Sequence, residues 1–183
     1  VVSLSGCGTQ PAASTTSSSP PAATAPSLPD RISTTGVVDA GIAEVAAADN
    51  AFSLALFQAV RASDENLVCS PYSAATILTL TMAGARGQTQ EEMKQALRIT
   101  LPYYRLHDAV NALDQSLTGG GQFTSANGIW AQEGRVIKQP FANVAGHYYG
   151  AAIDVYDMER DYAGLCKIIN EWVSEKTGGR ITD

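Results

Sequence analysis

A dozen residues without a charge constrain this sequence more than any other feature. Residues 72–83 are apolar or small on nearly every helical face, and they follow the pair Ser70-Pro71. A serine hydroxyl can cap a helix, and proline is tolerated at the first helical position because its missing N–H needs no partner there. A helix that is apolar on all sides must be buried. We therefore expect this helix at the centre of a hydrophobic core.

The residues after this helix predict a turn and a second helix. Gly84 and Gly87 are expected to end the first helix. Thr89 and Glu92 have the three-residue spacing of a capping box, in which each side chain bonds to the other's backbone N–H. We expect an amphipathic helix to start at Thr89 and to run to about Leu97.

Periodicity and turn residues place the other elements. We expect helices at 42–61, 106–117, 139–149 and 162–177, and strands at 67–69, 122–130 and 151–155. Trp130 and Trp172 are expected to be core aromatics. Cys69 and Cys166 are expected to be small buried hydrophobes, although an exported protein could pair them.

Length, charge and motifs exclude several functions. The chain has 183 residues, room for one domain, and its net charge of −6 opposes a nucleic-acid partner. The longest apolar run, residues 74–85, is shorter than the roughly 20 residues that span a bilayer. No metalloprotease, serine-hydrolase or phosphate-loop motif is present in the sequence. We predict no enzyme activity and no cofactor.

Three residues that could suggest catalysis have simpler explanations. His107 and His147 are the two histidines of the chain, too few and too far apart in sequence to build a metal site, and we expect both on helix surfaces. Ser70 is followed by proline and has no base placed near it, so it is interpreted as a helix cap and not as a nucleophile.

The first 29 residues differ in composition from the rest of the chain. They contain no charged residue and five of the eight prolines, which predicts disorder. Leu4-Ser5-Gly6-Cys7 resembles the lipobox of bacterial lipoproteins, in which the cysteine is lipid-modified after signal cleavage. We predict the end of a signal peptide at 1–7 with lipidation at Cys7, a disordered linker at 8–41, and a folded domain at 42–183.

Several motifs resemble the N-terminal region of serpins, the serine protease inhibitors. They are Asn66, Ser70-Pro71-x-Ser73, Leu78, Gly84-Ala85-x-Gly87-x-Thr89, Leu97, Asn127-Gly128-Ile129-Trp130 and Ile169-Asn170-x-Trp172-Val173. The resemblance implies an α+β serpin fold, here the N-terminal helical region and the first strands of the main sheet. Because a serpin is about twice as long, we expect this chain to be a fragment that lacks the reactive loop.

The resemblance also implies a function. A serpin traps a serine or cysteine protease when its cleaved reactive loop inserts into the main sheet, and Ser70, Pro71, Ser73 and Asn127 would belong to the region where that sheet opens. The helix at 106–117 lacks the basic residues with which some serpins bind heparin, so we expect no heparin site. A secreted or cell-surface inhibitor anchored to a bacterial membrane through Cys7 is the leading hypothesis. The alternatives are a non-inhibitory serpin acting as a binding protein or chaperone, and an unrelated cell-envelope lipoprotein.

Overall fold

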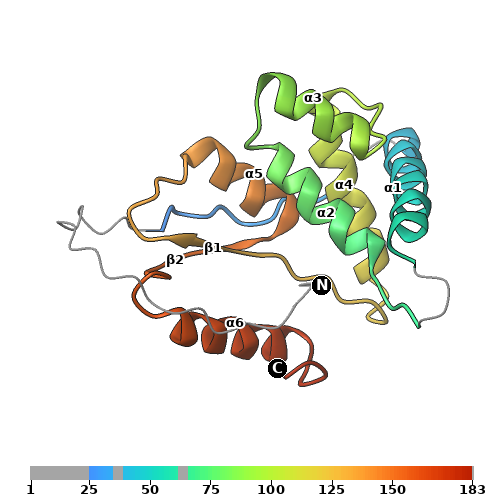
Figure 1. The fold of residues 1–183 in the computed structure, drawn as a ribbon. Helices are drawn as coiled ribbons and strands as arrows, with labels where there is room; N and C mark the ends of the chain where they lie inside the picture. The colour runs from blue at the N-terminus through green and yellow to red at the C-terminus, as the bar shows by residue number, and fades with distance from the viewer. Residues whose placement is uncertain (1–24, 35–38, 62–65, 183) are drawn as a thin grey trace.

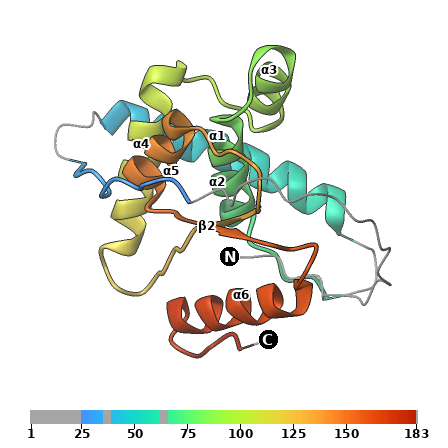
Figure 2. The same cartoon turned by 90° about the vertical axis from the view of Figure 1, so that its left-hand side faces the viewer.

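The structure, a computed structural model, describes residues 25–34, 39–61 and 66–182. Its elements in chain order are α1 (Asp39–Val60), α2 (Pro71–Met82), α3 (Gly87–Ala96), α4 (Tyr103–Thr118), β1 (Gly128–Gln132), α5 (Gln139–Tyr149), β2 (Ala152–Tyr156) and α6 (Tyr162–Lys176). β1 and β2 lie between α6 on one side and the other helices on the opposite side (Figures 1 and 2). This arrangement agrees with the predicted α+β class.

The start of α2 confirms the prediction from Ser70-Pro71. Ser70 is the N-cap, Pro71 is the first helical residue, and the Ser70 hydroxyl accepts a hydrogen bond from the Ser73 backbone N–H at 3.4 Å. The expectation of burial on all sides is wrong, because Ile77 and Leu78 are 37% and 39% exposed. One face of α2 enters the core and the opposite face lines a groove.

The core lies among the helices on one side of the sheet. Its buried members are Val45, Ala75, Leu80, Met82, Leu97, Leu101, Leu106, Ala109, Val110, Ala142, Ala145, Tyr149, Ala151 and Ile153. α4 and α5 contribute the small buried residues Ala109, Ala142 and Ala145 to this core. Only Ile153 comes from a strand, so the core is built mainly by the helices.

Two predictions for the first half of the chain are wrong, the start of α3 and a strand at 67–69. α3 begins at Gly87, and the side chain of its N-cap residue, Arg86, makes no capping hydrogen bond. Thr89 therefore lies inside the first turn, and no capping box forms. Residues 67–69 form no strand, because their backbone has no ladder partner among the described residues. Val68 there is 98% exposed.

The helices α1, α4, α5 and α6 confirm the predicted helices, with starts shifted by up to three residues. In the second half of α1, Phe52 and Leu56 are only half-buried, and Val60 at its end is 47% exposed. α5 begins at the predicted Gln139-Pro140 and ends at Gly150. Gly150 has a φ of 54°, the left-handed conformation that glycine adopts without strain.

The sheet has two strands in parallel register, with Gly128 opposite Ala152 and Gln132 opposite Tyr156. β1 begins later than predicted, since residues 122–127 form no strand. α6 packs on this sheet through Trp172, whose ring centroid lies 5.2 Å from that of Trp130 in an edge-to-face arrangement. Both tryptophans are half-buried, so they belong to this contact and not to the helical core.

Within the described ranges, no helix has both the length and the hydropathy that a membrane crossing requires. The predicted linker at 8–41 is described only in its last part. Residues 25–34 pack against α4 and α5, and α1 has already begun at Asp39. Residues 1–24, with the proposed lipidation site Cys7, lie outside the described residues.

Candidate functional site

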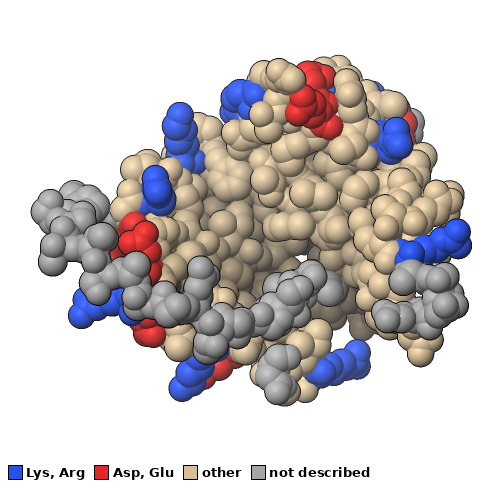
Figure 3. All heavy atoms as spheres, in the orientation of Figure 1, with Lys and Arg blue, Asp and Glu red and all other residues tan. Residues whose placement is uncertain are grey.

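A groove of about 920 Å³ separates α2 from the sheet. It is lined by Leu56, Val68, Cys69, Ser70, Ser73, Ala74, Ile77, Leu78, Ala126, Asn127, Gly128, Trp130 and Ile169. None of these residues is charged. On the face seen in Figure 3, Lys, Arg, Asp and Glu side chains likewise lie around the periphery and uncharged residues fill the centre. An uncharged groove of this size beside a sheet can accommodate an extended peptide segment.

Two of the predicted site residues form a hydroxyl pair at one wall of this groove. The Ser70 and Ser73 Oγ atoms lie 2.7 Å apart, and both residues are partly buried. A hydroxyl can donate one hydrogen bond and accept two, so this pair can exchange partners without leaving a polar atom unpaired. Pro71, between them, fixes the backbone at the first position of α2.

Asn127 lies at the opposite wall, directly before β1. Its Nδ2 donates to the backbone carbonyl of Tyr149 at 3.1 Å, and its own carbonyl accepts from the Ala152 N–H at 2.9 Å. The residue therefore ties the start of β1 to the end of α5. The structure brings Ser70, Ser73 and Asn127 to one groove, although more than 50 residues separate the serines from the asparagine in sequence.

The groove meets a sheet that is open at its edges. Within the described part of the chain, β1 and β2 pair only with each other, so each leaves one edge without a ladder partner. Unpaired strand edges present rows of N–H and C=O groups that can pair with another strand. Among the described residues, the uncharged groove therefore lies next to a strand edge without a ladder partner.

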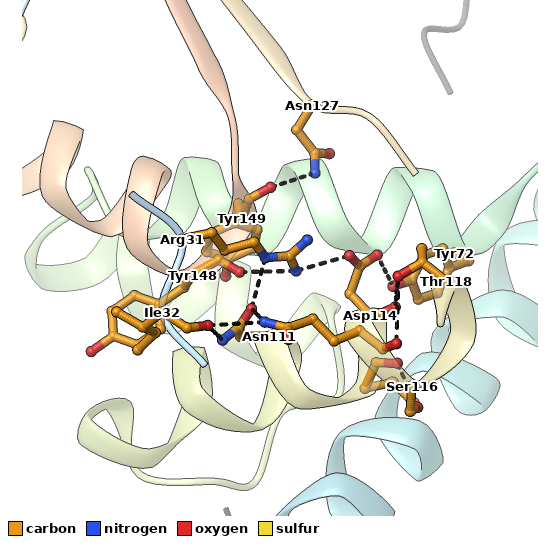
Figure 4. A network of polar contacts seen from close by, with 12 residues as sticks. Arg31, Ile32, Tyr72, Asn111, Asp114, Ser116, Thr118, Asn127, Tyr148 and Tyr149 are labelled. Carbon is orange, nitrogen blue, oxygen red and sulfur yellow. Dashed lines mark hydrogen bonds and ion pairs between the residues drawn. The ribbon is translucent and has the colours of Figure 1, made fainter. Parts of the chain in front are cut away.

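A polar network that the sequence did not predict lies behind the groove (Figure 4). Arg31 donates from Nη2 to the Asp114 carboxylate and from Nε to the Asn111 side-chain oxygen Oδ1, both at 2.8 Å. The second Asp114 oxygen accepts from the Tyr72 hydroxyl at 2.7 Å. Asn111 and Asp114 are 1% and 3% exposed. One signal was available: Asp114 follows Val110 by four residues and therefore falls on the apolar face of α4.

Burial and the neighbouring carboxylate act on the Tyr72 hydroxyl in the same direction. Desolvation raises the pKa of Tyr72, and its hydrogen bond to Asp114 raises that pKa further. The phenol therefore stays protonated and serves as a donor, not as a base.

The prediction that His107 lies on a helix surface is wrong. His107 is 5% exposed, and its Nδ1 lies 2.8 Å from the Tyr149 hydroxyl. Its Nε2 is buried and has no hydrogen-bond partner among the described residues. Burial lowers the pKa of His107 from 6.5 to about 4, so the ring is neutral at neutral pH. His147 is half-buried on α5.

The cysteines also depart from the prediction. Cys69 is free and exposed at the groove, so it is neither a buried hydrophobe nor the disulfide partner of Cys166. Cys166 is half-buried on α6.

The described residues contain no group of three or more histidine, cysteine or acidic side chains that could hold a metal ion. The groove lining combines two serines, an asparagine and the Cys69 thiol, and it contains no histidine, lysine or carboxylate. The serine hydroxyls and the asparagine amide can hydrogen-bond to a peptide backbone.

Comparison with known proteins gives one consistent family. Residues 47–183 match the sequence family described as "Serpin (serine protease inhibitor)". An uncharacterized serpin-like protein of Thermococcus kodakarensis is 31% identical over 138 residues, which cover 73% of this chain and 32% of the relative. Corticosteroid-binding globulin of Sus scrofa is 30% identical over 141 residues, covering 74% of this chain and 34% of the globulin.

Solved structures agree with the sequence comparison. Emu ovalbumin superposes with a TM-score of 0.69 at 19% identity, over 76% of this chain and 41% of ovalbumin, which is a likeness of fold. The chain spans about a third of the length of the curated relatives it matches.

Proposed function

The chain belongs to the serpin family, and from this premise we propose that it is the N-terminal part of a serine protease inhibitor that traps its target by loop insertion. In this mechanism a protease cleaves a reactive loop, and the cut loop enters the main sheet as a new strand before the acyl-enzyme is hydrolysed. The loop would lie in a part of the protein that this chain does not include. The protein would thus be an inhibitor and not an enzyme, and it needs no cofactor.

The observation that carries the proposal is the uncharged groove between α2 and β1. Strand insertion gains backbone hydrogen bonds and apolar burial, which requires a strand edge and an uncharged surface next to it. Within the described residues β1 leaves one edge without a ladder partner, and Ile77 and Leu78 offer apolar surface on the facing helix. We propose that Ser70, Ser73 and Asn127 exchange hydrogen-bond partners as the sheet opens, and that Pro71 keeps the start of α2 in place.

The location of the protein is part of the proposal. The Leu4–Cys7 motif supports export and lipid anchoring at Cys7 to a bacterial membrane, which would place the inhibitor at the cell surface or outside the cell. Labelled palmitate should be incorporated into the full-length protein and lost in Cys7→Ala. Palmitate incorporation that persists in Cys7→Ala would contradict this assignment. The family match removes the alternative of an unrelated envelope lipoprotein.

The test of inhibition uses the full-length protein with a panel of serine and cysteine proteases. We expect a covalent complex that survives denaturing electrophoresis, together with loss of protease activity. A loop that is cleaved while the protease remains active would contradict inhibition.

A second function is favoured by one relative. Corticosteroid-binding globulin, 30% identical to this chain, is by its name a binding protein. A non-inhibitory serpin that binds a ligand or acts as a chaperone would be cleaved without trapping the protease. The same electrophoresis experiment separates this function from inhibition.

A further inference from the structure

Residues 25–34 lie across α4 and α5 and are held there at several points. The Ser27 carbonyl accepts from Gln139 Nε2 at 2.9 Å, and the Ile32 N–H donates to the His147 carbonyl at 2.9 Å. Pro29 covers Gly146 so closely that a Cβ at Gly146 would come within 2.7 Å of the proline. The segment precedes residue 47, where the family match begins.

The carbonyl of Ile32 receives two further hydrogen bonds from α4. Asn111 Nδ2 donates to it at 3.2 Å and Gln115 Nε2 at 3.0 Å. Gln115 Nε2 also donates to the Asn111 side-chain oxygen Oδ1 at 2.8 Å. These α4 amides satisfy the backbone of a segment that has no helix or strand of its own. The surface of α4 is therefore matched to this segment.

Arg31 is the central contact of the segment. Its guanidinium forms an ion pair with Asp114, whose side chain is 4% exposed, while the Arg31 side chain is 28% exposed. Removal of Arg31 would leave the buried Asp114 carboxylate without a cation, with Tyr72 as its remaining side-chain donor. Breaking a buried pair from one side is more costly than the pair is stabilising, because an uncompensated charge remains.

The contacts of Arg31 lead to both walls of the groove. Tyr72, which shares Asp114 with Arg31, is the second residue of α2 and lies between the groove residues Ser70 and Ser73. On the other side, Arg31 Nη2 lies 3.4 Å from the Tyr148 carbonyl. The next carbonyl along α5, that of Tyr149, accepts from Asn127. The guanidinium therefore connects Asp114, which holds Tyr72 of α2, with the end of α5, which holds Asn127 before β1 (Figure 4).

We propose that residues 25–34 form a latch, and that its docking through Arg31 holds α2 and the start of β1 at the spacing that the groove has in this structure. Release of the latch removes the Arg31 hydrogen bonds to Asp114 and to the Tyr148 carbonyl, so α2 and β1 separate more readily. The regulatory consequence, easier entry of a strand, rests on the proposed function. The docking itself does not.

The first test is amide hydrogen exchange in the full-length protein. We expect Arg31→Ala to speed exchange by about 10-fold at the start of α2 and at Asn127–Gly128, and to lower the melting temperature by about 5 °C, the scale of one or two lost interactions. Arg31→Lys should have an exchange rate and a melting temperature between those of the unsubstituted protein and Arg31→Ala. Lysine keeps the charge but loses the planar fork that reaches Asp114 and Asn111 together.

The matched control is Val45→Ala, which removes buried methyl groups from α1 outside the Arg31 network. The two variants are compared at the same interval below their melting temperatures. Faster exchange at the groove in Arg31→Ala alone supports the latch. Equal exchange in Arg31→Ala and Val45→Ala overturns it.

The second test measures uptake of a peptide copied from the full-length protein's own reactive loop. Arg31→Ala should take up the peptide about 10-fold faster than Val45→Ala, as expected for a loss of one hydrogen-bonded charge contact. Equal uptake rates overturn the regulatory role of the latch. If the unsubstituted protein neither takes up the peptide nor traps a protease, the proposed function fails, and the exchange experiment still decides whether the latch exists.

Discussion

The two sides of α2 are built on different principles. Toward the helices, Leu80 and Met82 are 0% and 1% exposed and the buried polar groups are mostly paired. Toward the groove, Ile77 and Leu78 remain more than a third exposed, and the facing strand β1 is only half-buried along its length. One helix of twelve residues therefore separates a closed core from an open surface.

This difference shows how a chain without charge over twelve residues can serve two purposes. The inner face stabilises the fold, because burying a leucine side chain contributes roughly 1.5–3 kcal/mol. The outer face contributes less to stability in this arrangement and leaves apolar surface next to a strand edge that has no ladder partner among the described residues. We propose that this outer face is the part that functions, since it can gain burial when a strand enters.

The largest predicted effect tests the difference between the two faces of α2. Leu80→Ala should lower the free energy of unfolding by about 3–5 kcal/mol, because it leaves a cavity in a fully buried site. Leu78→Ala on the groove face is the matched control, and it should cost less than about 1.5 kcal/mol because that side chain already contacts solvent. Chemical denaturation of both variants measures the difference. Equal losses would mean that the two faces do not differ.

The second prediction concerns the pH dependence of the helical core. Burial lowers the pKa of His107 from 6.5 to about 4, so the unfolded chain binds a proton between these values and the folded protein does not. Stability from this group is therefore lost as the pH falls from about 6.5 to 4, by about 3 kcal/mol in total.

The titration of Asp49 changes stability with pH in the opposite direction, so Asp49 is replaced in order to measure the effect of His107. Burial raises its pKa from 3.8 to about 6, so its contribution to stability is lost as the pH rises through that range. In Asp49→Asn, unfolding measured between pH 4 and 7 should show the full loss on acidification. Adding His107→Phe should abolish the loss, and an unchanged pH slope in the double variant would rule out His107 as its source.

A third prediction tests the contact between the sheet and α6. A Cβ at Gly128 would lie 2.5 Å from the Trp130 ring and 3.3 Å from the Trp172 ring. Gly128→Ala should therefore displace the paired rings and cost about 1–3 kcal/mol, as overpacking does. Near-ultraviolet circular dichroism should report the displaced tryptophans. Gly120→Ala, with no atom within 4 Å of the added methyl group, should leave the spectrum unchanged.

The smallest predicted effect on stability is the one most specific to the groove. Ser70→Ala removes the α2 cap and the hydroxyl pair with Ser73, at a cost of about 1 kcal/mol. Asp161→Ala removes a comparable cap, the carboxylate that accepts from the Gly164 N–H at the start of α6. Both should lower the melting temperature of the full-length protein by similar amounts. Only Ser70→Ala should also speed premature loop insertion, and equal insertion rates would remove the proposed role of Ser70.

Features set by neighbouring residues were predictable from the sequence. The Ser70-Pro71 start of α2, the Gln139-Pro140 start of α5 and its end at Gly150 all depend on contacts within one or two turns. The resemblance to serpins at Ser70, Ser73 and Asn127 also identified residues that meet at one groove.

Features that depend on distant partners were not predictable. Residues 67–69 have a strand-like composition, but a strand needs a neighbour that local sequence does not supply. In the sequence, His107 has the position of a polar surface residue on an amphipathic helix. In the fold it is buried next to Tyr149, which lies 42 residues away in sequence. Arg31 follows a segment of low complexity, and its partner Asp114 is 83 residues further along the chain.

The central claim is that the groove between α2 and β1 opens to admit a strand, and Trp130 at its wall reports this directly. The measurement is stopped-flow fluorescence of the full-length protein mixed with its target protease, with Trp130→Phe as the background. We predict a Trp130 signal whose rate constant equals that of covalent complex formation. A covalent complex that forms with no change at Trp130 would contradict the account.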